Sequence, residues 1–329
     1  MIKILDCTLR DGGYINKWEF GENSIKTIYE NLQKSQIDYI EAGFLKDVCY
    51  NKNYTLFDEI EKLNIFQNNS KTKLCAMLMF GEFDISKIPE KTPDIHLDCI
   101  RYVFKKEQLQ KSIEEILKIK DLGYQVSVNP SNVDTYCDSE FLNLINTVNK
   151  IKPEIFCIVD TKGVLREKDV KRLYKITEEN LDENITAGFH SHNNLQLSFL
   201  NAKYLIKNSK RDLVIDSCVF GMGRGAGNLP TELLIQYINE NYDGKYNIIP
   251  VLKIIDEQIN PIFARTPWGY SIPYYLAAIN HCHPNYAKYL VDKQTVPVEI
   301  IDKLLFCIPD DKKTNYDEKL IEQIYRKNL

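Results

Sequence analysis

The chain has 329 residues, with 42 Lys and Arg against 46 Asp and Glu, a net charge of −4, and nine cysteines. Its hydrophobic fraction of 44% and charged fraction of 27% are typical of a folded globular protein and exclude wholesale disorder. The mild acidity and the absence of a basic stripe argue against a nucleic-acid partner. No apolar run approaches the ~20 residues that a membrane span needs, and the N-terminus lacks a signal-peptide core. The cysteines form no CxxC pair, so we expect a cytoplasmic protein with reduced, mostly buried thiols.

Short β-branched runs alternate with longer amphipathic segments as far as Gly244. The eight runs typical of strands are 2–9, 39–44, 73–79, 100–104, 125–129, 155–160, 185–192 and 213–219. The helical patterns between most of them are 24–34, 107–122, 140–150, 167–180, 195–208 and 230–241. This alternation predicts an α/β fold, and eight strands are the number that closes a (β/α)8 TIM barrel. A doubly wound sheet is the alternative, but the first strand is not followed by its GxGxxG signature.

The chain beyond Gly244 is richer in proline, tyrosine and helical pattern. We therefore predict two parts: a barrel catalytic domain over residues 1–244 and a helical C-terminal extension over residues 245–329 that packs on it. The aromatic residues of the extension supply a candidate dimer surface.

The ends of the predicted strands carry the chemistry, because the active site of such a barrel lies at the carboxyl ends of its strands. The first strand runs into Arg10 and Asp11, followed by two glycines. Adjacent Arg and Asp side chains let one ligate a cation while the other neutralises an anionic substrate, the alternative being a solvated ion pair in a turn. The seventh strand ends with His190 and His192, which strand alternation sends to the same face. Two imidazoles and one carboxylate are typical of a catalytic ion with open positions.

The eighth strand ends in a glycine-rich segment, 221–228, that has four glycines in its first seven residues. Such a segment either exposes backbone N–H groups to an anion or forms a tight turn that needs glycine, and both interpretations stay open. Asn228 at its end suits a helix N-cap or an outer metal ligand.

Three further polar residues lie on predicted strands. Glu41 is a carboxylate in an apolar strand that needs a partner such as Arg10, and it is a candidate for binding substrate. Asn129 and Asp160 end the fifth and sixth strands, where we expect them to line the cavity and bind substrate. His281 and His283 flank a cysteine in the extension, but no second ligand pair accompanies them, so we expect no zinc site there.

The three strand-end motifs together resemble one family, the metal-dependent pyruvate aldolase and lyase barrels of the DRE-TIM metallolyase superfamily (HMG-CoA lyase-like TIM barrels). The opening motif is 8–12, the HxH motif is 190–194 and the closing glycine-rich segment is 221–228, and the resemblance spans about residues 1–242. It implies that a divalent ion is held by Asp11, His190 and His192, with Asn228 at or near it. The ion implied is Mn²⁺ or Mg²⁺, with Zn²⁺ or Co²⁺ as alternatives. Arg10 would stabilise an enolate.

The closing segment looks most like that of the 4-hydroxy-2-oxovalerate aldolase branch. This implies an aldolase acting on a small-molecule 2-oxo acid, and either a homodimer or a complex with a partner dehydrogenase, as in related aldolases. Those aldolases carry a histidine, their proposed base, where this chain has Tyr14. Tyr14 is therefore the candidate acid–base group, although an unperturbed phenol near pKa 10 is a poor base. The segment 268–275 resembles the aromatic stretch after the barrel, so Tyr270 and Tyr274 are candidates for reaching the substrate.

Two other branches of the superfamily fit less well. The HMG-CoA lyase branch has a cysteine nine residues before its closing Asn, where this chain has Val219. The isopropylmalate synthase branch follows its Arg-Asp-Gly with Glu-Gln, where this chain has Gly13 and Tyr14. An acyl-CoA-dependent Claisen-condensing synthase (isopropylmalate or citramalate synthase-like) is thus the alternative enzyme, and a non-catalytic barrel subunit is the alternative outside catalysis.

Overall fold

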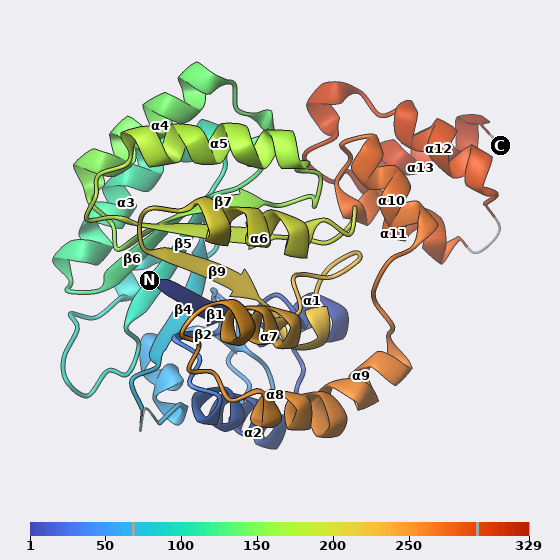
Figure 1. The fold of residues 1–329 in the computed structure, drawn as a ribbon. Helices are drawn as coiled ribbons and strands as arrows, with labels where there is room; N and C mark the ends of the chain where they lie inside the picture. The colour runs from blue at the N-terminus through green and yellow to red at the C-terminus, as the bar shows by residue number, and fades with distance from the viewer. Residues whose placement is uncertain (68–69, 294–295, 329) are drawn as a thin grey trace.

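The chain forms a closed barrel of parallel strands in a computed structural model that describes residues 1–67, 70–293 and 296–328 (Figure 1). β1 pairs with β2 on one side and with β9 on the other, which closes the ring, while the short β3 (Leu56–Phe57) only extends β2. All eight predicted strands are present, so the (β/α)8 prediction is confirmed. The barrel strands are β1 (Ile2–Asp6), β2 (Tyr39–Leu45), β4 (Lys73–Met79), β5 (Cys99–Phe104), β6 (Gln125–Pro130), β7 (Ile155–Asp160), β8 (Thr186–Ser191) and β9 (Leu213–Ser217).

Helices connect most of the strands on the outside of the barrel, and the six predicted ones are all found. The crossings from β2 to β4 and from β4 to β5 differ, since they contain the 3-10 turns Ile60–Ile65 and Ile85–Lys87 in place of α-helices. The helices of the barrel are α1 (Gly13–Asn16), α2 (Glu22–Lys34), α3 (Leu109–Asp121), α4 (Asp138–Ile151), α5 (Glu167–Asn180), α6 (Ser198–Asn208) and α7 (Thr231–Asn241).

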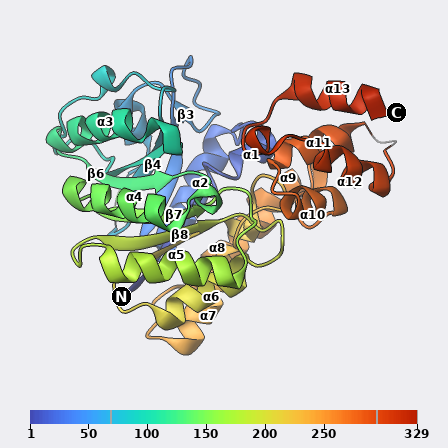
Figure 2. The ribbon, with the colours of Figure 1, turned by 90° about the horizontal axis from the view of Figure 1, so that it is seen from above.

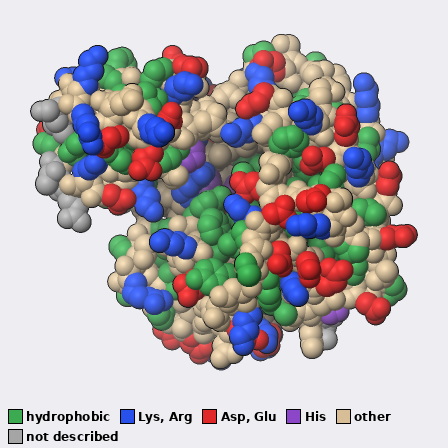
Figure 3. All heavy atoms as spheres, turned by 180° about the vertical axis from the view of Figure 1, so that it is seen from behind, with side chains coloured by type: hydrophobic (Ala, Val, Ile, Leu, Met, Phe, Trp, Pro, Cys, Tyr) green, Lys and Arg blue, Asp and Glu red, His purple; other side chains and the backbone are tan. Residues whose placement is uncertain are grey.

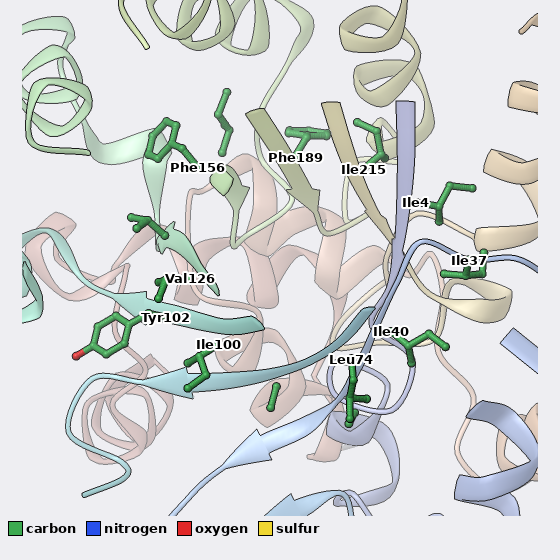
Figure 4. Close-up of a cluster of buried hydrophobic side chains, with 14 of the residues drawn as sticks. Ile4, Ile37, Ile40, Leu74, Ile100, Tyr102, Val126, Phe156, Phe189 and Ile215 are labelled. Atoms are coloured by element: carbon green, nitrogen blue, oxygen red, sulfur yellow. The ribbon is translucent and has the colours of Figure 1, made fainter. Parts of the chain in front are cut away.

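The outer faces of the strands and the inner faces of the helices form the main core. Alternation along each strand turns side chains such as Ile4, Leu74, Ile100, Phe189 and Ile215 away from the barrel axis, and all are fully buried (Figure 4). Burial of each such side chain contributes about 1.5–3 kcal/mol to the free energy of unfolding. The core thereby holds the barrel closed and fixes where each strand ends.

The inner faces of the strands fill the lower barrel with apolar side chains. Leu5, Tyr39, Ile155 and Val214 form a buried cluster there together with four cysteines. All nine cysteines are free and six of them are buried, as predicted from their single placement in the sequence. This apolar cluster excludes water from the lower part of the barrel. Charged side chains at the mouth of the barrel, just above it, therefore interact more strongly than they would in water.

The C-terminal helices divide between two cores. Residues of α8 (Ile248–Ile254) and of the π-turn Ile255–Ile259 belong to the barrel core, whereas residues 276–321 form a hydrophobic cluster of their own. The helices of this cluster lie beside the end of the barrel at which the strands terminate (Figures 1 and 2). The domain boundary at residue 244 stays a prediction. The remaining helices are α9 (Asn260–Arg265), α10 (Ile272–Ile279), α11 (Pro284–Asp292), α12 (Val298–Phe306) and α13 (Glu318–Asn328).

The first strand is shorter than the predicted run 2–9, and this positions the site. β1 ends at Asp6, because the backbone N–H groups of Arg10 and Asp11 both donate to the carbonyl of Cys7, at 3.1 and 2.8 Å. The resulting turn carries the Arg10 and Asp11 side chains over the mouth of the barrel. In the part of the chain that the structure describes, no helix is long and apolar enough to cross a bilayer.

Candidate metal centre

Three of the predicted metal ligands meet at the mouth of the barrel. Asp11 follows β1, while His190 and His192 lie at the end of β8, and their ligand atoms lie within 4.8 Å of one another. The Nε2 atoms of His190 and His192 are 3.3 and 3.8 Å from Asp11 Oδ2. Strand alternation places both imidazoles on the inner face, with ring centroids 5.3 Å apart. All three side chains are buried.

The guanidinium of Arg10 is held between two buried carboxylates. Its Nη1 lies 2.5 Å from Asp11 Oδ2, and its Nε lies 2.6 Å from Glu41 Oε2 on β2. The predicted pairing of Glu41 with Arg10 is therefore present. These contacts orient Arg10 across the cavity and leave its Nη2 without a hydrogen-bond partner among the described residues.

Two charged residues complete this layer, and we did not single them out from the sequence. Arg101 on β5 has Nη1 3.0 Å from Glu41 Oε1, and its Nη2 contacts Asp216 on β9 and, at 3.3 Å, Asn129 Oδ1. Asp216 Oδ2 in turn lies 3.1 Å from His190 Nδ1. The available signal was a charged residue on the inward face of each of two otherwise apolar strands.

The contacts form a closed ring that runs from Asp11 through the two arginines and back through His190. Two guanidiniums face three carboxylates in it, so the ring carries one net negative charge when both imidazoles are neutral. A cation at the open side of the ring, where Asp11 meets the histidines, would balance that charge.

The protonation of the two histidines supports this assignment. Burial disfavours a charged His190, but its hydrogen bonds with Asp11 and Asp216 outweigh burial and raise its pKa well above the ordinary value. Without a cation His190 therefore holds a proton facing Asp11. Asp216 accepts from Nδ1, which leaves Nε2 as the atom for a ligand. Burial lowers the pKa of His192 to about 3, so this ring is neutral and offers a lone pair.

Buried acceptors without partners are a second sign of a cation site. Asp11 Oδ1 and Asn228 Oδ1 are both buried and accept no hydrogen bond. The amide nitrogen of Asn228 is committed to the carbonyl of Met222, at 3.0 Å, and to Cys218 Sγ, at 3.3 Å. A Cβ atom on Gly223 would lie 2.0 Å from Asn228 Nδ2 and 3.2 Å from Asp11 Oδ1, so both side chains need glycine there. Two carboxylate or amide oxygens and two imidazoles fit a divalent transition-metal ion or Mg²⁺.

A cavity of about 100 Å³ opens above this cluster. Tyr14 forms part of its wall, and the guanidinium of Arg224 lies 5.3 Å from the centre of the tyrosine ring. Burial raises the pKa of the Tyr14 phenol above its ordinary value of 10. The polar and charged residues of the wall are Arg10, Asp11, Tyr14, Arg101, Asn129, Ser131, Thr161, His190, His192 and Arg224.

Four predicted substrate-contacting residues are absent from the wall of this cavity, among them Glu41, which pairs with Arg10 and Arg101. Both carboxylate oxygens of Asp160 accept backbone N–H groups, from Val164 at 2.9 Å and from Leu165 at 3.1 Å, and the side chain thus shapes the loop after β7. Tyr270 is 59% exposed, whereas Tyr274 lines a second cavity beneath the C-terminal helices. Their roles toward substrate stay predictions.

The glycine-rich segment forms a tight turn. Gly227 has a φ of +85°, and a Cβ there would lie 2.1 Å from the carbonyl oxygen of Gly221. Asn194, the last residue of the segment 190–194, accepts the N–H of Ala226 at 2.7 Å and links the turn to the end of β8. The turn carries Arg224 over the mouth of the barrel.

These features define a (β/α)8 barrel with a buried constellation of histidine, carboxylate and arginine at the carboxyl ends of its strands, where such barrels place their active sites. The HMGL-like family model matches residues 1–254. The chain belongs to the HMGL-like family, within the DRE-TIM metallolyase superfamily.

Proteins similar to this chain carry the names of more than one kind of enzyme. A 4-hydroxy-2-oxovalerate aldolase of Geobacillus genomosp. 3 is 23% identical over 241 residues, which are 72% of this chain and 70% of that protein. A 2-isopropylmalate synthase of Staphylococcus carnosus is 27% identical over 248 residues, 70% of this chain but 47% of that protein. Among solved structures, the N-terminal domain of a putative aldolase from Bacteroides vulgatus is 28% identical, with a TM-score of 0.75 over 92% of this chain and 99% of that one.

Proposed function

We propose that this protein is a divalent-metal-dependent carbon–carbon lyase of the aldolase type, which cleaves or forms a C–C bond of a 2-oxo acid through an enolate. The observation that carries the proposal is the meeting of Asp11, His190 and His192 beside a guanidinium fixed by two carboxylates. The similarity to proteins named 4-hydroxy-2-oxovalerate aldolase supports the aldolase direction.

The cation would be held by Asp11, His190 and His192, with Asn228 Oδ1 as a further or outer ligand. Mn²⁺ or Mg²⁺ suits the oxygen ligands, and the two imidazoles also suit Zn²⁺ or Co²⁺. When bound, it would supply Lewis-acid polarisation of the keto group of a 2-oxo acid. Asp216 fixes the tautomer of His190 through Nδ1 and so presents Nε2 to the centre.

Arg10 is the group proposed to stabilise the enolate. Glu41 and Asp11 hold its Nε and Nη1 and so fix the guanidinium, while Nη2 has no hydrogen-bond partner among the described residues and Arg10 lines the cavity. A donor fixed before the reaction stabilises the charge that develops on the enolate oxygen without reorganising.

Tyr14 is the proposed acid–base group of the cleavage. In its phenolate form it takes the proton of the 4-hydroxyl, the C3–C4 bond breaks to release an aldehyde, and the electron pair passes into the enolate. The phenol then returns its proton to C3, which yields the shorter 2-oxo acid and restores the phenolate. The guanidinium of Arg224 over the ring favours the phenolate, but burial raises the pKa of Tyr14, so the rate should increase from neutral toward alkaline pH.

Release of pyruvate from 4-hydroxy-2-oxopentanoate, followed with lactate dehydrogenase and NADH, tests the proposal. We expect activity with Mn²⁺ or Mg²⁺, its loss after EDTA, and a loss of at least 100-fold together with bound metal in Asp11→Asn. Asp47→Asn is the matched control, because Asp47 is an exposed carboxylate that pairs with Lys87 and belongs neither to the ligand cluster nor to the wall of the cavity above it. Full activity and metal content in Asp11→Asn would contradict the proposal.

A second candidate is a Claisen-condensing synthase that joins an acyl-CoA to a 2-oxo acid. The 27% identity to a 2-isopropylmalate synthase favours it. The test is release of the CoA thiol from acetyl-CoA in the presence of a 2-oxo acid. If this occurs and the first assay gives no pyruvate, the synthase activity is supported and the aldolase activity is contradicted.

A further inference from the structure

A second cavity, of about 200 Å³, lies between the mouth of the barrel and the C-terminal helices. It shares Tyr14 and Arg224 with the cavity above the metal centre, so the two are neighbours across these side chains. The surface is hollowed between the barrel and the C-terminal lobe, and histidine and Lys or Arg side chains are exposed in that hollow (Figure 3). We call this second cavity the distal chamber. The residues that line it are Tyr14, Ile15, Arg224, Gly225, Thr266, Pro267, Trp268, Tyr274, Pro284, Asn285 and Lys288.

The charge of the distal chamber is one-sided. Its lining includes the guanidinium of Arg224 and the ammonium of Lys288, and no Asp or Glu. Neither cation forms an ion pair with a carboxylate in the described part of the chain, whereas the buried arginines below, Arg10 and Arg101, each contact two. Two uncompensated cations in one concave site attract an anion.

Arg224 is only partly satisfied by the protein. Its Nη2 donates to the carbonyl of Thr161 at 3.0 Å, and its Nε is buried without a partner. Its Nη1 lies 3.2 Å from Nε2 of His283, the residue that precedes α11.

The contact between Arg224 and His283 lacks an acceptor. His283 Nδ1 accepts the backbone N–H of Asn285 at 3.1 Å, so the proton of a neutral ring lies on Nε2. Burial, followed by the charge of Arg224, lowers the pKa of His283 well below its ordinary value and keeps the ring neutral. Two N–H donors therefore face each other, and an oxygen anion that accepts from both would complete the arrangement.

We propose that the distal chamber binds a second acidic group of the substrate, a carboxylate or a phosphate, while the 2-oxo acid end lies at the metal centre. The acidic group would be held by the lining residues Arg224 and Lys288 and by His283, which adjoins the lining residue Pro284 and contacts Arg224. This inference rests on the proposed function and narrows it. The substrate is then a 2-oxo acid with an anionic group at its far end, in place of the short alkyl end of 4-hydroxy-2-oxovalerate. Tyr14 and Arg224 stand between the two ends, beside the bond that reacts.

Binding of uncleavable 2-oxo acids tests the distal chamber without catalysis. The full chain, loaded with Mn²⁺, is titrated calorimetrically with 2-oxoglutarate, 2-oxoadipate and 2-oxopimelate. Each is paired with the monoanionic 2-oxo acid of equal carbon number, and the 5-phosphate of 5-hydroxy-2-oxopentanoate distinguishes a phosphate from a carboxylate end. We expect at least one dianion to bind about tenfold more tightly than its monoanionic partner, because charge-assisted hydrogen bonds to a partly desolvated site are strong.

Three variants test whether the preference for dianions over monoanions arises in the distal chamber. In Lys288→Gln the preference should fall to about twofold, and in His283→Asn, which keeps an acceptor for the Asn285 N–H, it should fall as well. Lys303→Gln removes the same charge from exposed α12, outside the chamber lining, and should keep the full preference.

Two results would contradict the proposed binding in the distal chamber. One is a preference for the dianion below twofold for every pair in the wild-type chain. The other is an unchanged preference in both Lys288→Gln and His283→Asn. If the chain releases pyruvate from 4-hydroxy-2-oxopentanoate but shows no preference for dianions, the proposed aldolase activity is supported and only the proposed binding in the distal chamber is contradicted. If the chain prefers dianions, loses that preference in Lys288→Gln and cleaves no 4-hydroxy-2-oxo acid, the proposed binding in the distal chamber is supported and the proposed aldolase activity is contradicted.

Discussion

Replacement of Asp216 by Asn tests the inner support of the metal centre. Asp216 touches neither the cavity above the cluster nor its open side, yet its Oδ2 contacts both Arg101 and His190 Nδ1. Burial alone would raise the pKa of Asp216, but Arg101 and the hydrogen bond from His190 outweigh burial and lower it, so the native side chain is a carboxylate. Asn at this position removes the charge and leaves either a donor or an acceptor facing the imidazole.

The expected size of the effect follows from these contacts. Loss of an outer carboxylate behind a ligating histidine weakens metal affinity by about 10- to 100-fold, or about 1.4–2.8 kcal/mol. Removing one member of a buried ion pair costs about 3–5 kcal/mol of unfolding free energy. We expect the lower end for Asp216→Asn, because Arg101 keeps Glu41 at 3.0 Å.

Mn²⁺ affinity by calorimetry and the midpoint of thermal unfolding, each with and without metal, measure the two effects. Asp212→Asn is the control, because Asp212 is a 53% exposed carboxylate on the segment leading into β9, and among the described residues its one ion pair is with the amino group of Met1. An affinity for Mn²⁺ within twofold of the wild type, in a variant that unfolds cooperatively, would refute the role given to Asp216.

Three other substitutions test separate parts of the structure. Arg10→Lys should lower kcat for pyruvate release by about 100-fold with metal content retained, since one point charge cannot satisfy two carboxylates and also reach the enolate; a kcat within threefold of the wild type contradicts that role. Gly223→Ala should weaken Mn²⁺ binding at least tenfold, because the added Cβ would lie 2.0 Å from Asn228 Nδ2, and unchanged affinity would remove Asn228 from the centre. Burial raises the pKa of Asp6 to about 6, so the folded chain keeps a proton that the unfolded chain releases near pH 3.8. The free energy of unfolding should therefore fall by about 2 kcal/mol more in the wild type than in Asp6→Asn between pH 4 and 6. Urea titrations at both pH values measure this difference, and equal falls would show that the carboxyl is not perturbed. Asn keeps the contact with Thr231, whose hydroxyl also reaches Ser217 Oγ at 2.8 Å.

The sequence predicted the barrel because each strand and helix is encoded locally. β-branched runs and amphipathic spacing of about 3.6 residues arise within single segments, and the predicted helix 167–180 has the bounds of α5 (Glu167–Asn180). The placement of His190 and His192 on one face likewise needs only the two-residue period of a strand. The two crossings between β2 and β5, whose described residues form 3-10 turns and no α-helix, are also the segments whose sequence has no helical period.

Closure of the barrel and the docking of the C-terminal helices determined the remaining parts of the site. The contact of Arg101 with Asp216 spans 115 residues, and that of Arg224 with His283 spans 59. No local period relates residues so far apart, because their distance depends on which strands become neighbours and on how one core packs against another. Local patterns in the sequence thus determined the scaffold and brought His190 and His192 to one face at the end of β8. Only tertiary packing placed Arg101 and Asp216 beside His190. Only tertiary packing also placed His283, from the C-terminal helices, against Arg224 at the mouth of the barrel.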